Sequence, residues 1–259
     1  MNLLNALPIY LLVLVRLASF FVTMPIFSYR TIPGRVKIGL AAILALIVTA
    51  TLMRETPPLS INAYYLLLII KEAIVGLSIG FVAGLLIYAV QMAGYFIDVQ
   101  MGLAIANTIN PENGVTSPLT GQFLNVLALL LMLALDGHLM LIKGILDSFR
   151  LIKVNDLSIH LMQGSTAHFI VNVFLKMVGI SFQMAMPIIA CLFLVDVALG
   201  IVARTVPQVN VFIVGLPMKI IVGFVLLLLI FPVFFTLVHT IFELMAEAVN
   251  SYMQFLGSF

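Results

Sequence analysis

Residues 196–219, D-V-A-L-G-I-V-A-R-T-V-P-Q-V-N-V-F-I-V-G-L-P-M-K, form the stretch that decides how the whole chain is interpreted. A long apolar run ends at Asp196, and Arg204, Pro207 and two amides interrupt the sequence before it becomes apolar again after residue 210. In a membrane, backbone broken by proline needs other hydrogen-bond partners, and a buried cation needs a counter-charge or water. The stretch therefore predicts a segment that packs against protein rather than lipid.

The composition of the chain is that of an integral membrane protein. Of its 259 residues, 63% are hydrophobic and 8% are charged, whereas a soluble domain is about half apolar and a quarter charged. The net charge of +2 is too small and too dispersed to predict a nucleic-acid partner. The single cysteine, Cys191, cannot form an internal disulfide, and alone it makes no metal site.

Six apolar segments have the length, or nearly the length, of about 20 residues that a membrane helix needs. They cover residues 7–27, 38–53, 64–90, 123–146, 169–194 and 220–238. Residues 103–118 are the most turn-rich part of the chain, because Asn, Gly, Pro and Ser are the residues that turns use. We therefore predict an all-α integral membrane protein, with a single membrane domain over residues 1–259.

Several charged residues lie inside the apolar segments, where lipid would not stabilise them. Ionisable groups at membrane depth pack against protein or line a water-filled cavity. Lys71 and Glu72 are neighbours, and adjacent residues of a helix do not face each other. We therefore expect each of these two to find a partner elsewhere, or water. The predicted buried charges are Arg16, Lys71, Glu72 and Lys176.

Three glycines, Gly76, Gly80 and Gly84, recur every four residues and therefore share one helix face. Such a face lets another helix backbone approach closely, so we predict helix packing there. The alternative is that glycine is merely common in membrane helices.

The distribution of Lys and Arg does not indicate which loops of a simple six-helix bundle would face the cytoplasm. They divide almost evenly between the two sides of such a bundle, whereas cytoplasmic loops normally carry an excess of Lys and Arg. Together with the prolines inside the apolar segments, this predicts broken helices and an arrangement other than a simple multi-pass bundle.

No catalytic or nucleotide-binding motif occurs in the sequence, so we predict no enzymatic activity, no catalytic residue, no metal and no cofactor. Residues 136–138, D-G-H, suggest either a metal or acid/base site or a turn with a capping aspartate, and the motif alone favours the turn. Charge inside a membrane marks either a transport path or a protein interface. This leaves a small-solute transporter and a subunit of a larger membrane assembly as candidates. The two halves of the chain look unlike, which favours the subunit.

The pattern D-x-x-L-G-x-x-x-R-x-x-P-Q-x-N-V-F-x-x-G-x-P-x-K resembles the signature of the FliR family of type III export-gate subunits. Arg16 with Pro25, and Gly94 with Asp98, fit the same family, so the resemblance covers essentially the whole chain. The form G-L-P-M-K is closer to the flagellar branch than to the virulence branch, which stays an alternative. The predicted subunit-contact residues of the signature are Asp196, Gly200, Arg204, Pro207, Gln208, Asn210, Phe212, Gly215, Pro217 and Lys219.

The resemblance implies a core subunit of the flagellar protein export gate in the bacterial cytoplasmic (inner) membrane, at the flagellar basal body. It implies assembly with FliP and FliQ into a channel, cooperation with FlhA and FlhB, and passage of exported unfolded flagellar proteins. It also implies a FliP-like helical part over residues 1–167 and a FliQ-like helical hairpin over residues 168–259. Membrane lipid is expected to contact the chain.

The resemblance further implies that the loop at 103–118 contributes to a plug that closes the pore. Polar residues dominate this loop, so steric blocking is expected rather than a tight hydrophobic seal. The candidate plug residues are Ile105, Asn107, Ile109, Asn110, Pro111 and Val115.

Overall fold

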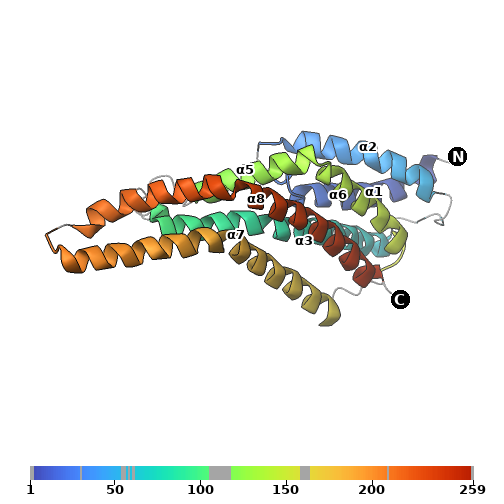
Figure 1. The fold of residues 1–259 in the computed structure, drawn as a ribbon. Helices are drawn as coiled ribbons and strands as arrows, with labels where there is room; N and C mark the ends of the chain where they lie inside the picture. Colours follow the sequence, from blue (N-terminus) through green and yellow to red (C-terminus); the bar gives the residue numbers. More distant parts are fainter. Residues whose placement is uncertain are drawn as a thin grey trace. The chain divides into compact units, whose positions relative to one another are not determined.

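A computed structural model describes residues 3–29, 31–53, 57, 59, 62–104, 118–157, 164–208 and 210–257. It confirms the all-α prediction, since these residues contain helices and no strand. Figure 1 shows the helices in chain order: α1 (Leu3–Thr23), α2 (Gly34–Leu52), α3 (Ala63–Met101), α5 (Leu119–Ala134), α6 (Gly137–Leu151), α7 (Gly164–Thr205) and α8 (Val211–Gly257).

Three of the helices are longer than the sequence segments that predicted them. α3 has 39 residues, α7 has 42 and α8 has 47. At about 1.5 Å per residue each extends for roughly 60–70 Å, about twice the thickness of the hydrocarbon core. Prolines stay inside the helices, Pro187 in α7 and both Pro217 and Pro232 in α8. These lengths confirm that the chain is not a simple bundle of single crossings.

Five helices in the described part of the chain are long and apolar enough to cross a membrane. They are α1, α2, α3, α7 and α8, and the broken pair α5 and α6 would make a sixth. The count agrees with the six predicted apolar segments.

The break between α5 and α6 differs from the predicted capped turn. Asp136 has φ 56° and ψ 20°, in the left-handed region, and its side chain forms no capping hydrogen bond. An N-cap residue normally has extended backbone, which directs its side chain to the first free N–H groups. The backbone carbonyl of Asp136 instead accepts from the N–H of Leu139 at 3.0 Å. The turn is present, but its aspartate does not cap α6.

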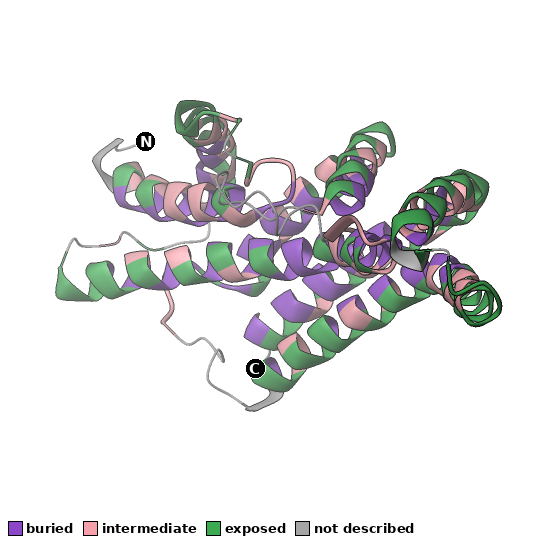
Figure 2. Ribbon diagram, turned by 90° about the vertical axis from the view of Figure 1, so that its left-hand side faces the viewer, coloured by how far each residue is buried: buried purple, intermediate pink, exposed green. Residues whose placement is uncertain are grey.

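The chain divides into two compact units, and each contains segments from both the N-terminal and the C-terminal part of the sequence. The first comprises Met1–Leu85, Met132–Phe174 and Glu243–Phe259, and the second comprises Leu86–Leu131 and Leu175–Phe242. In the first unit, Leu12, Phe20 and Ile79 are buried together with Tyr252. Figure 2 shows that each long helix buries only part of its surface.

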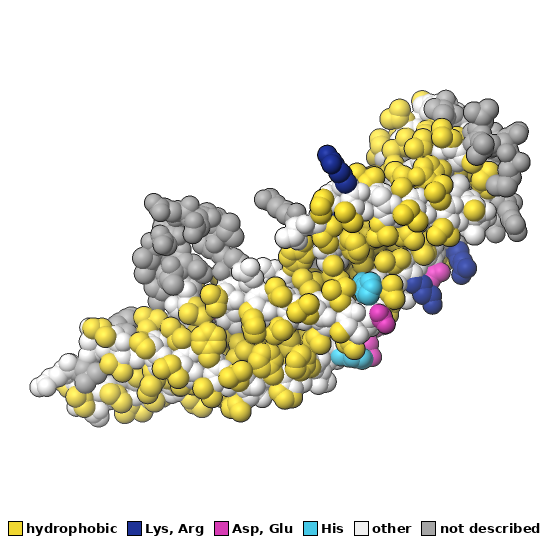
Figure 3. Space-filling view, turned by 90° about the horizontal axis from the view of Figure 1, so that it is seen from above, with side chains coloured by type: hydrophobic (Ala, Val, Ile, Leu, Met, Phe, Trp, Pro, Cys, Tyr) yellow, Lys and Arg dark blue, Asp and Glu magenta, His cyan; other side chains and the backbone are white. Residues whose placement is uncertain are grey.

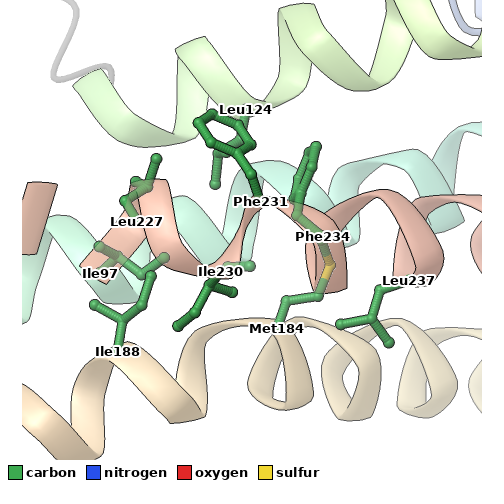
Figure 4. Close-up of a pocket in the computed structure, with 10 residues that line it drawn as sticks. Ile97, Leu124, Met184, Ile188, Leu227, Ile230, Phe231, Phe234 and Leu237 are labelled. Carbon is green, nitrogen blue, oxygen red and sulfur yellow. The ribbon is translucent and has the colours of Figure 1, made fainter. Parts of the chain in front are cut away.

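In the second unit, α3, α5, α7 and α8 enclose a small apolar cavity. Figure 4 shows its lining, with side chains from all four helices directed toward one another. Ile97 comes from α3, Leu124 from α5, Met184 and Ile188 from α7, and Phe231 from α8.

Candidate functional site

The first unit contains a fully buried ion pair between Arg16 of α1 and Glu72 of α3. Arg16 Nε donates to Glu72 Oε2, and Arg16 Nη2 donates to Glu72 Oε1 at 2.9 Å. The guanidinium also donates to Ser148 Oγ at 3.1 Å and to the carbonyl oxygen of Ile152 at 3.0 Å. It lies over the ring of Phe149, 4.2 Å from the centroid. These contacts use the several fixed N–H directions of arginine to join α1 and α3 to the end of α6.

Lys71 lies next to this pair, and the expectation that it cannot pair with Glu72 is wrong. The Lys71 ammonium forms an ion pair with the Glu72 carboxylate. It also donates to the carbonyl oxygens of Lys153 at 2.7 Å and Asp156 at 3.0 Å, which follow α6. The side chains of Lys71 and Glu72 are long enough to meet, although their positions on the helix are adjacent. The backbone carbonyls offset the second positive charge of this Arg16–Glu72–Lys71 cluster.

Lys176 differs from the expectation of burial. Its side chain is exposed on α7. Within the described part of the chain, no hydrogen bond or ion pair joins it to another residue. The buried face of α7 instead contains Val173, Met177 and Ser181, at helical spacing. Lys176 precedes Met177 and lies about 100° from it around the helix, so it points away from that face.

The three regularly spaced glycines of α3 are all buried. A side chain at Gly76 would overlap the carbonyl oxygen of Arg16 and the hydroxyl of Ser19. One at Gly80 would overlap Thr23 Oγ1. α1 therefore lies directly against these two glycines, at a distance that leaves no room for a methyl group.

In the second unit, the buried carboxylate of Asp98 binds the start of α5. Its two oxygens accept from the backbone N–H of Thr120 at 3.2 and 3.1 Å, which satisfies a donor that the first turn of a helix leaves free. A side chain at Gly94, one turn earlier, would overlap the backbone of Gly121. α3 and α5 thus meet at a glycine–glycine crossing that is fixed by one carboxylate.

Asp196 joins three helices of the second unit near the connection between α7 and α8. It forms an ion pair with Lys219 of α8, with Nζ 2.9 Å from Oδ1. Gln100 of α3 donates from Nε2 to Asp196 Oδ2 at 3.1 Å. Gly102, two residues after Gln100, has φ 83°, and the side chain of Leu216 lies next to it. The first and last residues of the quoted signature are therefore in direct contact.

Asp98 and Gln100 are not among the predicted subunit-contact or buried-charge residues, although Asp98 is among the residues that fit the resemblance. The available signal was the pair of polar residues that follows the apolar segment 64–90, because polar groups that stay at membrane depth need partners. The sequence did not show that those partners come from α5 and α7.

The remaining signature residues lie around the connection between α7 and α8. Arg204, Pro207 and Gln208 are exposed, and Gly200 has no atom within 4 Å of the position of a side-chain carbon. The carbonyl of Asn210 accepts from the N–H of Ile213 at 3.1 Å at the start of α8. Gly215 is buried and Pro217 is exposed.

Some predicted residues lie outside the described part of the chain. The side chain of Phe212 is one of them. The others are the candidate plug residues Ile105, Asn107, Ile109, Asn110, Pro111 and Val115. The described structure ends at Ala104 and resumes at Pro118, on either side of that loop.

The sequence matches the family described as bacterial export proteins, family 1, over residues 7–245. The flagellar biosynthetic protein FliR of Bacillus subtilis (strain 168) is 46% identical to it, over 99% of this chain and 98% of the relative. FliR of Pectobacterium carotovorum subsp. carotovorum is 35% identical, over 84% and 82% of the two chains. FliR of Escherichia coli (strain K12) is 29% identical, over 95% of each. Because these matches span nearly the whole length of both partners, the chain belongs to the FliR family of bacterial export proteins, family 1.

Proposed function

We propose that this protein is a core subunit of the flagellar type III protein export gate. In this proposal it forms, with FliP and FliQ, the inner-membrane channel for unfolded flagellar proteins, and FlhA and FlhB work beside it. The observation that carries the proposal is the 46% identity to a flagellar biosynthetic protein over 99% of the chain. The role is structural and non-enzymatic.

The surface of the chain supports a role inside a membrane assembly. Figure 3 shows a face on which hydrophobic side chains predominate and charged ones are few. Such a surface suits contact with lipid or with other membrane subunits. The exposed Arg204 and Gln208, with the open space beside Gly200, suit a neighbouring chain that approaches closely. We infer that the signature residues form subunit contacts there.

Copurification tests this proposal. We expect the tagged protein to extract from membranes as a stable complex when FliP and FliQ are coexpressed, and to aggregate when expressed alone. In that complex, a photocrosslinker at position 208 should attach to another gate subunit rather than only to a stalled export substrate. A chain that is stable alone, retains neither partner and moves a small solute in liposomes would instead be a transporter.

We also infer that the loop at residues 103–118 contributes to a plug of the pore. The contacts at both ends of this loop support the idea, because Asp98 holds the end of α3 to the start of α5 and Gln100 holds it to α7. These hydrogen bonds would then hold both ends of the plug loop in place.

Deleting residues 107–117 should leave the complex assembled but permeable to ions in its resting state, because these hydrogen bonds remain while the blocking segment is gone. Conductance of the purified complex in planar bilayers measures this. A Gly/Ser segment of equal length in place of the loop is the matched control for loop closure. Conductance equal to that of the unaltered complex, with normal assembly, would contradict the inference.

A further inference from the structure

The exposed surface of α7 in the second unit separates into two stripes of different chemistry. One contains large apolar side chains, Leu175, Phe182, Met186 and Phe193, which are 46–60% exposed. The other contains Lys176, Gly179, Gln183 and Pro187, all exposed and spaced three or four residues apart. Residues with this spacing share one helix face. We call this second set the Lys176 stripe.

The large apolar stripe suits lipid, but the Lys176 stripe does not. A charged or amide group inside an apolar helix normally faces protein or a wet cavity. Small residues such as Gly179 mark places where membrane helices approach closely, and no atom lies within 4 Å of a side-chain carbon placed there. The stripe therefore offers both the polar groups and the space that a second helix needs.

Pro187 adds a further requirement for a partner. Proline has no N–H, so it cannot donate the helical hydrogen bond to the carbonyl of Gln183, four residues earlier. In a membrane such a carbonyl needs a donor from a neighbouring helix, a side chain or water. The carbonyl that lacks this bond and the Gln183 amide lie on the same stripe, about two helical turns from Lys176.

Charge indicates what kind of helix would dock on this stripe. Three cations that lie away from the ends of the apolar helices α1, α3 and α8 pair with a carboxylate of the chain: Arg16 and Lys71 share Glu72, and Lys219 pairs with Asp196. Lys176 has no such counter-charge among the described residues. The missing carboxylate would then come from another chain.

We propose that the Lys176 stripe is the docking face for a membrane helix of a neighbouring subunit, which places an Asp or Glu opposite Lys176 and a hydrogen-bond donor near the Gln183 carbonyl. The proposal rests on the proposed function, because it requires the chain to be part of a membrane assembly. A second copy of this chain and lipid alone are the occupants that the proposal excludes.

Site-specific photocrosslinking in intact membranes tests the docking face without requiring a substitution that impairs folding. A photocrosslinker at position 183 should form an adduct with another protein chain, and one at position 193, which is 60% exposed on the apolar stripe, should not. Mass spectrometry should place the adduct on a membrane helix that contains a carboxylate. Lipid adducts only, equal protein adducts at both positions, or attachment to a second copy would overturn the proposal.

The charge requirement is tested in the same membranes. Lys176→Glu should reduce the adduct at position 183 by about tenfold or more, because like charges across an interface repel, whereas Lys176→Arg should keep it. Reversing the partner's carboxylate to lysine should restore the adduct with Lys176→Glu. Lys143→Glu, a charge reversal at an exposed site of the first unit, is the matched control. An adduct unaffected by Lys176→Glu would overturn the proposal, whereas loss of FliP and FliQ from the unaltered protein would overturn only the proposed function.

Discussion

Glu72→Ala should destabilise the protein by about 3–5 kcal/mol, the usual cost of removing one partner from a buried ion pair. Two cations lose their counter-charge at once, because Arg16 and Lys71 both pair with this carboxylate. Neither can reach water without opening the packing of α1 and α3, since Arg16 is fully buried and Lys71 nearly so. The free energy of unfolding in mixed micelles, followed by circular dichroism, measures the effect.

The matched control for this prediction is an exposed ion pair of the same unit. Asp147 and Arg150 lie 3.6 Å apart, and the arginine side chain is 85% exposed. Asp147→Ala should change stability by less than about 1 kcal/mol, because solvent screens such pairs. Glu72→Gln should fall between the two, since it keeps hydrogen-bond acceptance but removes the charge. Equal stability of Glu72→Ala and the unaltered protein would show that the cluster does not hold the helices together.

Gly94→Ala should have the second large effect, a loss of about 3 kcal/mol, at the upper end of the range for overpacking. The added methyl group would overlap the Cα and N of Gly121, which are backbone atoms that no rotamer change can move. Separating α3 from α5 would also weaken the hydrogen bonds from Thr120 to Asp98. Stability and the yield of assembled complex should therefore fall together.

Gly39→Ala in α2 is the control for Gly94→Ala, because no atom lies within 4 Å of the new methyl group. Alanine is favoured over glycine inside a helix by about 0.5–1 kcal/mol, so this variant should be neutral or slightly more stable. The same unfolding titration compares the two substitutions. A Gly94→Ala protein as stable as Gly39→Ala would contradict the close crossing of α3 and α5.

Local properties of the sequence were enough to predict the helices, but they predicted the helix ends less reliably. The segments predicted at residues 64–90 and 220–238 are parts of α3 and α8, which extend well beyond them. Polar residues such as Asp98 and Gln100 look like interruptions when only local hydropathy is considered. They stay helical because α5 and α7 supply their hydrogen-bond partners.

Charged residues show the same limit of sequence reasoning. Hydropathy alone singles out Arg16, Glu72 and Lys176 as unusual, yet the structure buries the first two and exposes the third. The difference depends on which helices meet. Glu72 lies 56 residues from Arg16 along the chain, and Lys71 lies 82 residues from the carbonyl of Lys153.

Composition and local pattern are sufficient to show that the chain is helical, that it belongs in a membrane and that it resembles one family along its length. These properties follow from composition, from hydrogen bonds between residues four positions apart and from a signature confined to 24 consecutive positions, 196–219. The packing of the helices is needed to show that Glu72 pairs with two cations, that Asp98 binds the start of α5 and that Asp196 contacts Lys219 and Gln100. The physical reason is that a buried charge is stabilised by whichever group the fold brings within hydrogen-bond distance, and the spacing of residues along one helix does not specify the helix opposite.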